Sequence, residues 1–513
     1  MGLHNKSRIL IAATSSGSGK TLITCGILRL LKQLNMDPVS FKCGPDYIDP
    51  MFHRTVLKVD SSNLDSFFLP PEELNEIVDN SQGKIAVIEG VMGIYDGSTV
   101  DSYEGSCYSV AKAVHAPVIL VVDAKGAGRT IISLIKGILA DDDCRLIKGI
   151  ILNRMSGYYY KKIAGVLEKE IGKLRDDVGL LGFLPKLDGI GIDSRHLGLK
   201  MPEEICDIDS QIDTVAAAIK ENCDIDKLLE ISRAEVNVDG TTFNAVNITK
   251  DIGKNEQVDI TQHSGSGIEV DITHCSDDTI LVDITLAVAR DSAFCFYYKE
   301  NIEQFEKLGV NIQYFSPLED KQLPDADGIL LGGGYPELYL ERLSANKSML
   351  ESVKTAIDSK IPVLAECGGF MYLHDCIEDS EGKEYAMAGV IQGKCKDTGH
   401  LVRFGYITLE ESAASEAAGD TSAGADSMNT ESAGAGHAQS PVSGIKAHEF
   451  HYYDSTNNGA ACVARKPDGS KTWECMISDG VSYMGFPHLY YKSKPEFVIK
   501  FVEAMRKYHE QFK

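Results

Sequence analysis

Residues 9–21 read Ile-Leu-Ile-Ala-Ala-Thr-Ser-Ser-Gly-Ser-Gly-Lys-Thr, and this stretch predicts the fold around it. The apolar run 9–13 is typical of a buried strand, and residues 22–34 have the pattern of an amphipathic helix. A glycine-rich loop between a strand and a helix indicates phosphate binding, because its backbone N–H groups and the helix N-terminus attract anions. We expect Lys20 to reach the β- and γ-phosphates and Thr21 to bind Mg²⁺, with the nucleotide also held by Thr14, Gly17 and Gly19.

Two positions in this loop depart from common patterns. Thr14 occupies the place where the usual phosphate-loop pattern has a glycine. Ser15 stands where ATPases that partition DNA or select division sites carry an extra lysine, which argues against that subgroup. The alternative for the whole stretch is an ordinary Gly/Ser turn. Gly-Lys-Thr between a strand and a helix favours the nucleotide site.

Composition limits the kind of protein. The 513 residues suffice for two or three domains, and 43% apolar with 25% charged residues is an ordinary globular mixture. The net charge of -24 argues against a nucleic-acid partner. No apolar run is long enough to span a membrane, and the short polar segment before the first strand predicts no signal peptide. The 13 cysteines lack metal-binding spacing and are expected to be reduced thiols of a cytoplasmic protein.

A second loop with charged residues follows the predicted strand 39–42. Residues 43–50 read Cys-Gly-Pro-Asp-Tyr-Ile-Asp-Pro, and two prolines make this a rigid loop. Asp46 is expected to face the phosphates and to contribute to Mg²⁺ binding, if this strand neighbours the first. The alternative is an aspartate that only holds its own turn. Lys42 is either a site residue or an ordinary solvated lysine.

Further polar residues follow the next predicted strands. Strand 85–90 carries Glu89 at its end, where a carboxylate is the expected Mg²⁺ contact. Asp96 is either a substrate-positioning residue or a turn residue before a glycine. Asn153 closes strand 147–154, where its amide either reads a base or caps a helix. Alternation of these strands with helices, through strands 117–123 and 180–185, predicts a parallel, doubly wound sheet.

A polar stretch, 234–278, has no sustained period and is expected to be an interdomain linker. A second α/β unit follows it. We expect strands at 285–289, 309–315 and 328–331, and a helix over 291–308. Residues 411–441 are rich in Ala, Ser, Gly and Glu and are interpreted as a low-complexity surface insertion.

The second half has its own chemical signal at Cys367. The predicted strand 361–366 runs into Cys367-Gly-Gly-Phe, which has the layout of a nucleophile elbow. We expect a helix N-terminus behind the cysteine to lower the thiol pKa. The alternative is a buried structural cysteine. The general base must come from elsewhere, and His488, at the end of Tyr-Met-Gly-Phe-Pro-His, is the candidate.

Together the two halves resemble the family of cobyrinic acid a,c-diamide synthases, which are glutamine- and ATP-dependent. The resemblance covers nearly the whole chain apart from the linker and the insertion. It rests on seven segments: 14–21, 42–50, 89–97, 332–337, 366–370, 448–452 and 485–488. It implies an N-terminal domain similar to dethiobiotin synthetase over 1–232, a linker over 233–279 and a class I glutamine amidotransferase domain over 280–513.

The resemblance also implies a mechanism. Cys367 would attack the glutamine amide with His488 as general base, and N–H groups near Gly333 and Gly368 would form the oxyanion hole. The ammonia would pass to the first domain, where ATP and Mg²⁺ serve to phosphorylate a substrate carboxylate. Ammonia would then displace the phosphate, once on the a and once on the c acetate side chain. The protein would thus be a carbon–nitrogen ligase with L-glutamine as the amido donor.

Several points stay open at this stage. Most class I amidotransferases carry a glutamate two residues after the catalytic histidine, and His488-Leu-Tyr offers none, which leaves the orientation of His488 unexplained. His448 and His451 are interpreted as one wall of a corrinoid site at the domain interface, with a metal site as the alternative. Ni-sirohydrochlorin or hydrogenobyrinic acid are rival substrates, and cobyric acid synthase shares the plan. A rival of another class is a nucleotide-switched binding protein with an inert second half. The oligomeric state, with a homodimer among the options, is not determined.

Overall fold

The computed structural model describes residues 6–187, 189–190, 207–234, 236, 283–412 and 440–512. The predicted linker and the predicted low-complexity insertion therefore lie almost entirely outside the described residues. Within the described ranges, no helix has both the length and the apolar character needed to cross a bilayer.

The N-terminal half is built on a seven-stranded sheet in the order β3-β2-β4-β1-β5-β6-β7, with every neighbouring pair parallel. The strands are β1 (Ser7–Ala13), β2 (Pro38–Cys43), β3 (Ser61–Leu64), β4 (Ile85–Glu89), β5 (Val118–Asp123), β6 (Ile147–Asn153) and β7 (Gly179–Phe183). The helices are α1 (Lys20–Gln33), α2 (Ile48–Thr55), α3 (Pro71–Asn80), α4 (Cys107–Ala113), α5 (Thr130–Ala140), α6 (Gly157–Gly172), α7 (Ile208–Asn222) and α8 (Ile225–Ser232). The predicted doubly wound sheet is confirmed, and its carboxyl edge carries the phosphate loop.

The C-terminal half is built on a six-stranded sheet in the order β10-β8-β11-β13-β23-β22, in which only the edge strand β22 is antiparallel. The strands are β8 (Thr285–Ala289), β10 (Asn311–Phe315), β11 (Gly328–Leu331), β13 (Val363–Glu366), β22 (Ile477–Ser478) and β23 (Tyr483–Gly485). The helical segments are α9 (Lys299–Lys307), η2 (Pro336–Leu338), α10 (Leu340–Ala345), α11 (Lys347–Asp358), α12 (Gly368–Tyr372), η3 (Tyr491–Ser493) and α14 (Pro495–Phe512). The α/β prediction for this half is confirmed as well.

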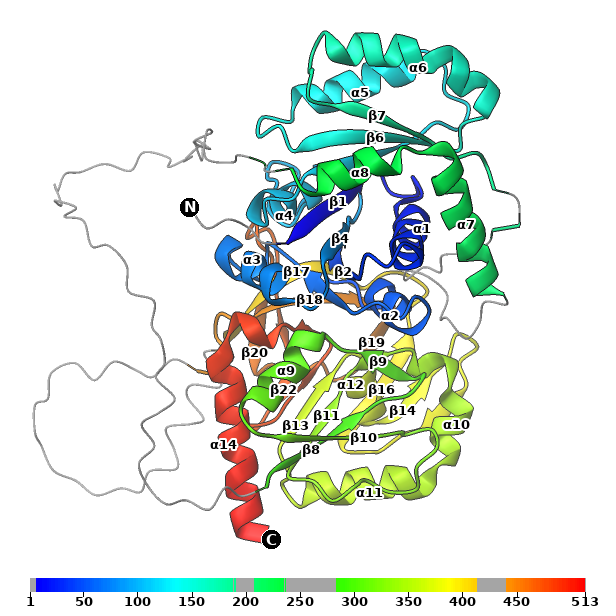
Figure 1. The fold of residues 1–513 in the computed structure, drawn as a ribbon. Helices are drawn as coiled ribbons and strands as arrows, with labels where there is room; N and C mark the ends of the chain where they lie inside the picture. The colour runs from blue at the N-terminus through cyan, green and yellow to red at the C-terminus, as the bar shows by residue number, and fades with distance from the viewer. Residues whose placement is uncertain are drawn as a thin grey trace, which may run out of the picture.

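Smaller sheets, which were not predicted, complete the C-terminal half. One contains β14 (His374–Glu378), β15 (Glu384–Ala386), β16 (Ile391–Asp397) and β19 (Tyr453–Ser455). Another contains β17 (Arg403–Glu411), β18 (Lys446–His451), β20 (Cys462–Arg465), β21 (Thr472–Cys475) and β24 (His488–Leu489). Strands β17 and β18 lie where the two halves meet (Figure 1). They bring residues from late in the chain to the N-terminal half.

The predicted helix over 291–308 is wrong in its first half. Phe294–Phe296 form strand β9, which pairs with β12 (Gly333–Gly334), and α9 begins only at Lys299. The Asp291 carboxylate accepts hydrogen bonds from the backbone N–H groups of Ala293 and Phe294, which stabilises a turn there. The pairing with a distant glycine strand overrides the local helical pattern.

The two halves share apolar contacts. Phe296, Tyr298, Tyr335 and Tyr490 of the C-terminal half belong to the same buried cluster as the core of the N-terminal half. Figure 1 shows α2 and β2 of the N-terminal half facing β9 and β19 of the C-terminal half. The interface is therefore a continuation of a hydrophobic core.

Candidate active site

The phosphate loop joins β1 to α1 and is shaped by two left-handed glycines. Gly17 has φ +72° and Gly19, at the start of α1, has φ +92°. The buried Lys20 ammonium donates to the backbone carbonyls of Ser15 and Met92, so its Nζ lies across the inside of the loop. Burial lowers the pKa of Lys20. The geometry is that of a lysine placed to meet an anion held by this loop.

Asn153 lies against this loop, at the end of β6. Its Nδ2 donates to the carbonyl of Ser18 at 2.8 Å, and a Cβ at Gly19 would lie 2.2 Å from the same nitrogen. The helix-cap alternative is wrong, because Ser156 caps α6 through the N–H of Tyr159. The structure thus shows Asn153 as a support of the loop.

A buried charged cluster lies beside Thr21, centred on Glu89. Glu89 Oε1 accepts from Thr21 Oγ1 at 2.5 Å and from Lys42 Nζ at 2.9 Å. Lys42 Nζ also pairs with Asp49 at 2.5 Å, and His53 Nε2 lies 3.2 Å from Glu89 Oε2. Burial raises the pKa of Glu89, but the charges and hydrogen bonds of Lys42 and His53 more than offset it and hold that pKa well below its usual range.

Lys42 is therefore not a solvated lysine, since it is only 4% exposed and forms two ion pairs. Asp49 and His53 were not singled out from the sequence. Lys42 and Glu89 are aligned across β2 and β4, and Asp49 and His53 lie on the helix that follows β2. The only feature of the sequence that could have indicated Asp49 and His53 is their spacing, which places them one turn apart on α2.

Asp46 and Asp96 both hold local turns. Asp46 Oδ1 accepts from the backbone N–H groups of Ile48 and Asp49 at the start of α2. Asp96 Oδ2 accepts from the Gly93 N–H at 2.7 Å. Asp46 also lines the cavity described below, so its turn role and a site role are compatible. Asp96 is not among the described residues that line this cavity.

Cys367 occupies the predicted elbow between β13 and α12. Its backbone, with φ +48° and ψ −103°, is in a strained region for a residue with a side chain, and its N–H donates to the Gly485 carbonyl at 2.8 Å. The expectation of a lowered thiol pKa is wrong: burial raises the pKa of Cys367. Helix α12 has five residues, too few to offset burial. The cysteine is a neutral thiol that needs a base.

His488 and the predicted oxyanion-hole glycines lie together. A Cβ at Gly333 would lie 2.4 Å from His488 Cε1, and one at Gly368 would lie 3.2 Å from the Gly334 nitrogen. Burial lowers the pKa of His488, so its imidazole is neutral and able to accept a proton. The structure brings this histidine, 121 positions after Cys367, to the glycines that flank the elbow.

His448 and His451 do not form one wall. His448 stacks on His488, with ring centroids 4.9 Å apart, and accepts or donates a hydrogen bond with the Tyr298 hydroxyl at 3.0 Å. His451 instead stacks on Phe486 and lines a separate small cavity with Arg403 and Glu449. Burial lowers the pKa of His448 to about 3 and that of His451 to about 4. The predicted shared wall is therefore wrong, because only His448 lines the cavity between the halves, and its contact with a corrinoid stays a prediction.

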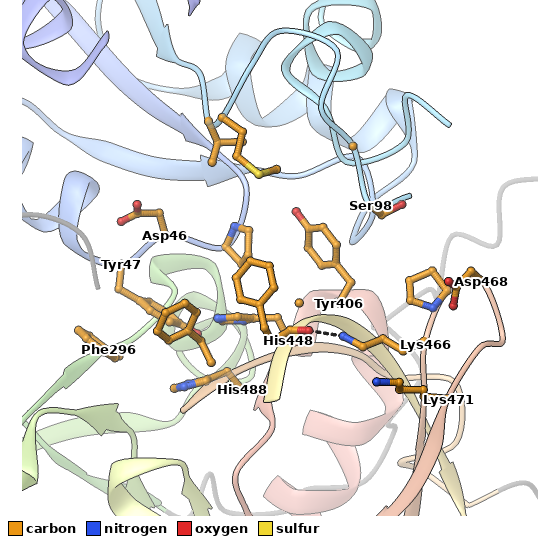
Figure 2. Close-up of a pocket in the computed structure, with 18 of the residues that line it drawn as sticks. Asp46, Tyr47, Ser98, Phe296, Tyr406, His448, Lys466, Asp468, Lys471 and His488 are labelled. Carbon is orange, nitrogen blue, oxygen red and sulfur yellow. Dashed lines mark hydrogen bonds between the residues drawn. The ribbon is translucent and has the colours of Figure 1, made fainter. Parts of the chain in front are cut away.

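A cavity of about 550 Å³ lies between the two halves and is lined by residues of both. Met92, whose carbonyl accepts from Lys20, lines one side, and His448 and His488 line another. Figure 2 shows Tyr47 and Phe296 beside the two histidines, and Lys466 and Lys471 toward the opposite end. Five aromatic residues line the cavity: Tyr47, Phe296, Phe404, Tyr406 and Phe450.

The side-chain oxygens predicted to bind Mg²⁺ are adjacent but few. Thr21 and Glu89 are in direct contact. Within the described ranges, no group of three or more His, Cys, Asp or Glu residues is arranged to hold a metal ion. This fits Mg²⁺, which is usually bound by one or two protein oxygens together with phosphates and water. It also disfavours the metal-site alternative for His448 and His451.

Comparison with known proteins finds a matching family of domains for each half of the chain. Residues 9–198 match the CobQ/CobB/MinD/ParA nucleotide binding domain, and residues 285–484 match the CobB/CobQ-like glutamine amidotransferase domain. Proteins named cobyrinate a,c-diamide synthase are similar over nearly the whole length. That of Listeria innocua is 33% identical over 97% of this chain and 99% of its own, and that of Picrophilus torridus is 36% identical over 97% and 98%.

The chain belongs to the cobyrinate a,c-diamide synthase family. The member from Salmonella typhimurium is 34% identical over 97% of this chain and 98% of its own. Among solved structures, a putative GMP synthase component from Thermoplasma acidophilum covers 45% of this chain and 97% of its own at 16% identity and a TM-score of 0.27, a likeness too slight to inform on fold or function. In this chain, the nucleotide-binding half and the amidotransferase half both line one cavity.

Proposed function

We propose that the protein amidates the a and c acetate carboxylates of cobyrinic acid, with ATP and L-glutamine as co-substrates. The observation that carries this proposal is the cavity whose wall includes both Met92, bonded to Lys20, and His488. A carboxylate inside it can be phosphorylated from one side and meet ammonia from the other. The names of the relatives support the choice of substrate.

In the N-terminal half, Lys20 and the loop N–H groups neutralise the phosphates of ATP. Mg²⁺, held by Thr21 and Glu89 with Asp46 as a further oxygen ligand, would supply additional charge neutralisation at the phosphates. A carboxylate is a poor electrophile, and phosphorylation converts its oxygen into a leaving group. Asn153 and Gly19 keep the loop in shape while Lys20 moves from the Met92 carbonyl to the nucleotide.

In the C-terminal half, the neutral pair of Cys367 and His488 releases ammonia from glutamine. His488 takes the thiol proton as Cys367 attacks the amide carbon, and a thioester forms. Backbone N–H groups at Gly333 and Gly368 stabilise the oxyanion. Ammonia then reaches the acyl phosphate through the cavity, and phosphate leaves.

The cavity suits a tetrapyrrole with carboxylate arms. Its aromatic walls offer stacking surfaces, and Lys466 and Lys471 offer cations for acidic side chains (Figure 2). Burial lowers the pKa of Lys466, whose Nζ also donates to the Phe404 carbonyl. His448, which stacks on His488, would contact the macrocycle from the side of His488.

The domain limits of 1–232 and 280–513 remain our proposal, with the two sheets as support. A cytoplasmic location is also proposed, because the co-substrate ATP is cytoplasmic and 13 cysteines without metal-binding spacing in a long, well-cored chain are typical of reduced thiols.

The deciding experiment is an amidation assay with ATP, glutamine and each candidate macrocycle in turn. We expect cobyrinic acid to gain two amides, seen by mass spectrometry. Amidation of Ni-sirohydrochlorin or hydrogenobyrinic acid alone would show that the protein carries out the same reaction on that macrocycle instead. A protein that amidates none of them would refute the proposal.

Replacing Cys367 by Ala separates this function from that of a nucleotide-switched binding protein. We expect glutamine-driven amidation to disappear and ammonia-driven amidation to persist at high ammonium concentration. Lys20→Ala should abolish both, since both need ATP. If Cys367→Ala retained glutamine-driven amidation, Cys367 would not be the nucleophile.

A further inference from the structure

Glu366, the residue before Cys367, is a buried carboxylate that the proposed mechanism does not use. It ends β13, is 5% exposed, and its Oε1 accepts from the Tyr491 hydroxyl at 2.7 Å. Its Oε2 lies 4.0 Å from Nδ1 of His488. Within the described part of the chain, that nitrogen has no hydrogen-bond partner, although it is fully buried.

A buried imidazole nitrogen without a hydrogen-bond partner is destabilising. The carboxylate oxygen at 4.0 Å is the acidic group in contact range of this nitrogen. Catalytic hydrogen bonds are often long in the free enzyme and tighten when substrate binds. The backbone keeps the two side chains near each other, because Glu366 pairs with Gly485 across β13 and β23 and His488 follows Gly485 closely in the chain.

We propose that Glu366 is the positioning residue of His488, the role that a glutamate after the histidine has in most class I amidotransferases. Its carboxylate accepts the Nδ1–H, which leaves the lone pair of Nε2 free to take the thiol proton of Cys367. The third member of the triad thus precedes the nucleophile in the chain. This inference rests on the proposed glutaminase function of Cys367 and His488.

Protons and bonds balance in this arrangement. The Cys367 sulfur bonds to the amide carbon and its proton moves to Nε2, which forms an imidazolium beside the Glu366 carboxylate. The imidazolium returns that proton to the departing nitrogen, the C–N bond breaks, and ammonia and a thioester remain. Water, deprotonated by the same nitrogen, then hydrolyses the thioester to glutamate and restores the thiol.

The pKa of Glu366 lies in a range that an experiment can reach. Burial raises the pKa of Glu366 to about 8, partly offset by the Tyr491 hydroxyl and the Leu489 backbone. The carboxylate, and with it the competent tautomer of His488, therefore increases as the pH rises through about 8. The titratable groups that face Glu366 are His488, Cys367, Tyr47, Tyr297, Tyr298 and Tyr491. Burial raises the pKa of all four tyrosines and of the thiol, so they stay neutral there.

The test is Glu366→Gln, which keeps the shape and an acceptor for Tyr491 but offers an N–H₂ or a neutral oxygen to Nδ1. We expect the glutaminase kcat to fall by about 10²–10⁴-fold, as for loss of the orienting carboxylate in other triads, with KM for glutamine little changed. The rise of kcat/KM near pH 8 should vanish. Glu300→Gln removes another buried carboxyl of the same half and serves as the matched control, with unchanged glutaminase activity.

A purely structural role predicts a different result. In that case Glu366→Gln would lower the melting temperature and leave the pH profile of the remaining activity intact. Either this outcome or an unchanged kcat would overturn the proposal. If the variant does not fold, the pH profile of the unaltered protein is the test. A glutaminase kcat/KM that is flat between pH 6 and 9 would contradict the inference. Failure of the proposed function would appear separately, as glutaminase activity that survives Cys367→Ala.

Discussion

At the scale of single residues, Lys42 has a structural role that its sequence pattern did not indicate. It is the one cation placed directly between the buried carboxylates of Asp49 and Glu89 in the described cluster. Those charges raise its pKa well above the usual value, although burial acts in the opposite direction. Removing a partner from a buried ion pair leaves an uncompensated charge.

Lys42→Met should therefore lower the free energy of unfolding of the N-terminal half by about 3–5 kcal/mol. Urea unfolding followed by circular dichroism measures this loss. Lys299→Met is the matched control, because Lys299 pairs with Asp60 at a half-exposed site and such pairs contribute at most about 1 kcal/mol. Equal losses in the two variants would show that the cluster does not depend on Lys42.

At the scale of elements, the segment 44–49, a loop that continues into the first turn of α2, contacts residues of both candidate sites. One end presents Asp46 and Asp49 to the side of Glu89, and Tyr47 packs on Phe296 and on His488, with ring centroids 5.1 and 5.3 Å apart. The loop is rigid because Asp46 accepts from two backbone N–H groups. This short segment is therefore in contact with both candidate sites.

Tyr47→Ala should uncouple the two reactions, because the removed ring opens the wall beside His488. We expect more glutamate per amide formed, measured by the ratio of the two products. Tyr47→Phe keeps the ring and should keep the ratio near that of the unaltered protein. A ratio unchanged in Tyr47→Ala would show that the ring does not separate the sites.

At the scale of the whole molecule, the halves are joined by a buried polar contact within an aromatic interface. Tyr406 donates to Asp65 Oδ2 at 2.7 Å, and Phe67 and Phe68 pack around the tyrosine ring. Burial raises the pKa of Asp65 to about 6, partly offset by Tyr406 and backbone N–H groups. The stability that this protonated group contributes is complete below about pH 4 and is lost as the pH rises through 6.

Asp65→Asn should remove this pH dependence, since the amide is neutral and can still bond to Tyr406. We expect the variant to melt at a higher temperature than the unaltered protein at pH 8 and at about the same temperature at pH 5. Scanning calorimetry at the two pH values measures the difference. A variant that melts lower at both values would mean that the ionised carboxylate stabilises the interface.

Local patterns in the chain were enough to predict the strand–loop–helix at 9–34, the buried strands, Glu89 at a strand end and the elbow at Cys367. These features depend on neighbours within a few residues, where periodicity and glycine placement are decisive. The same local reasoning failed at 291–308, because the pairing of β9 with Gly333 and Gly334 is a contact with a segment about 40 residues away.

What the sequence by itself determined is therefore the phosphate loop of 9–21, the two α/β halves and the elbow cysteine. Only the tertiary structure decided which groups meet: Lys42 with Asp49 and Glu89, Glu366 with His488, and His448 without His451. It also decided protonation, since burial makes Cys367 a neutral thiol where the helix N-terminus alone suggested a thiolate. The physical reason is that burial and charge pairing depend on residues far apart in the chain, and no local spacing records them.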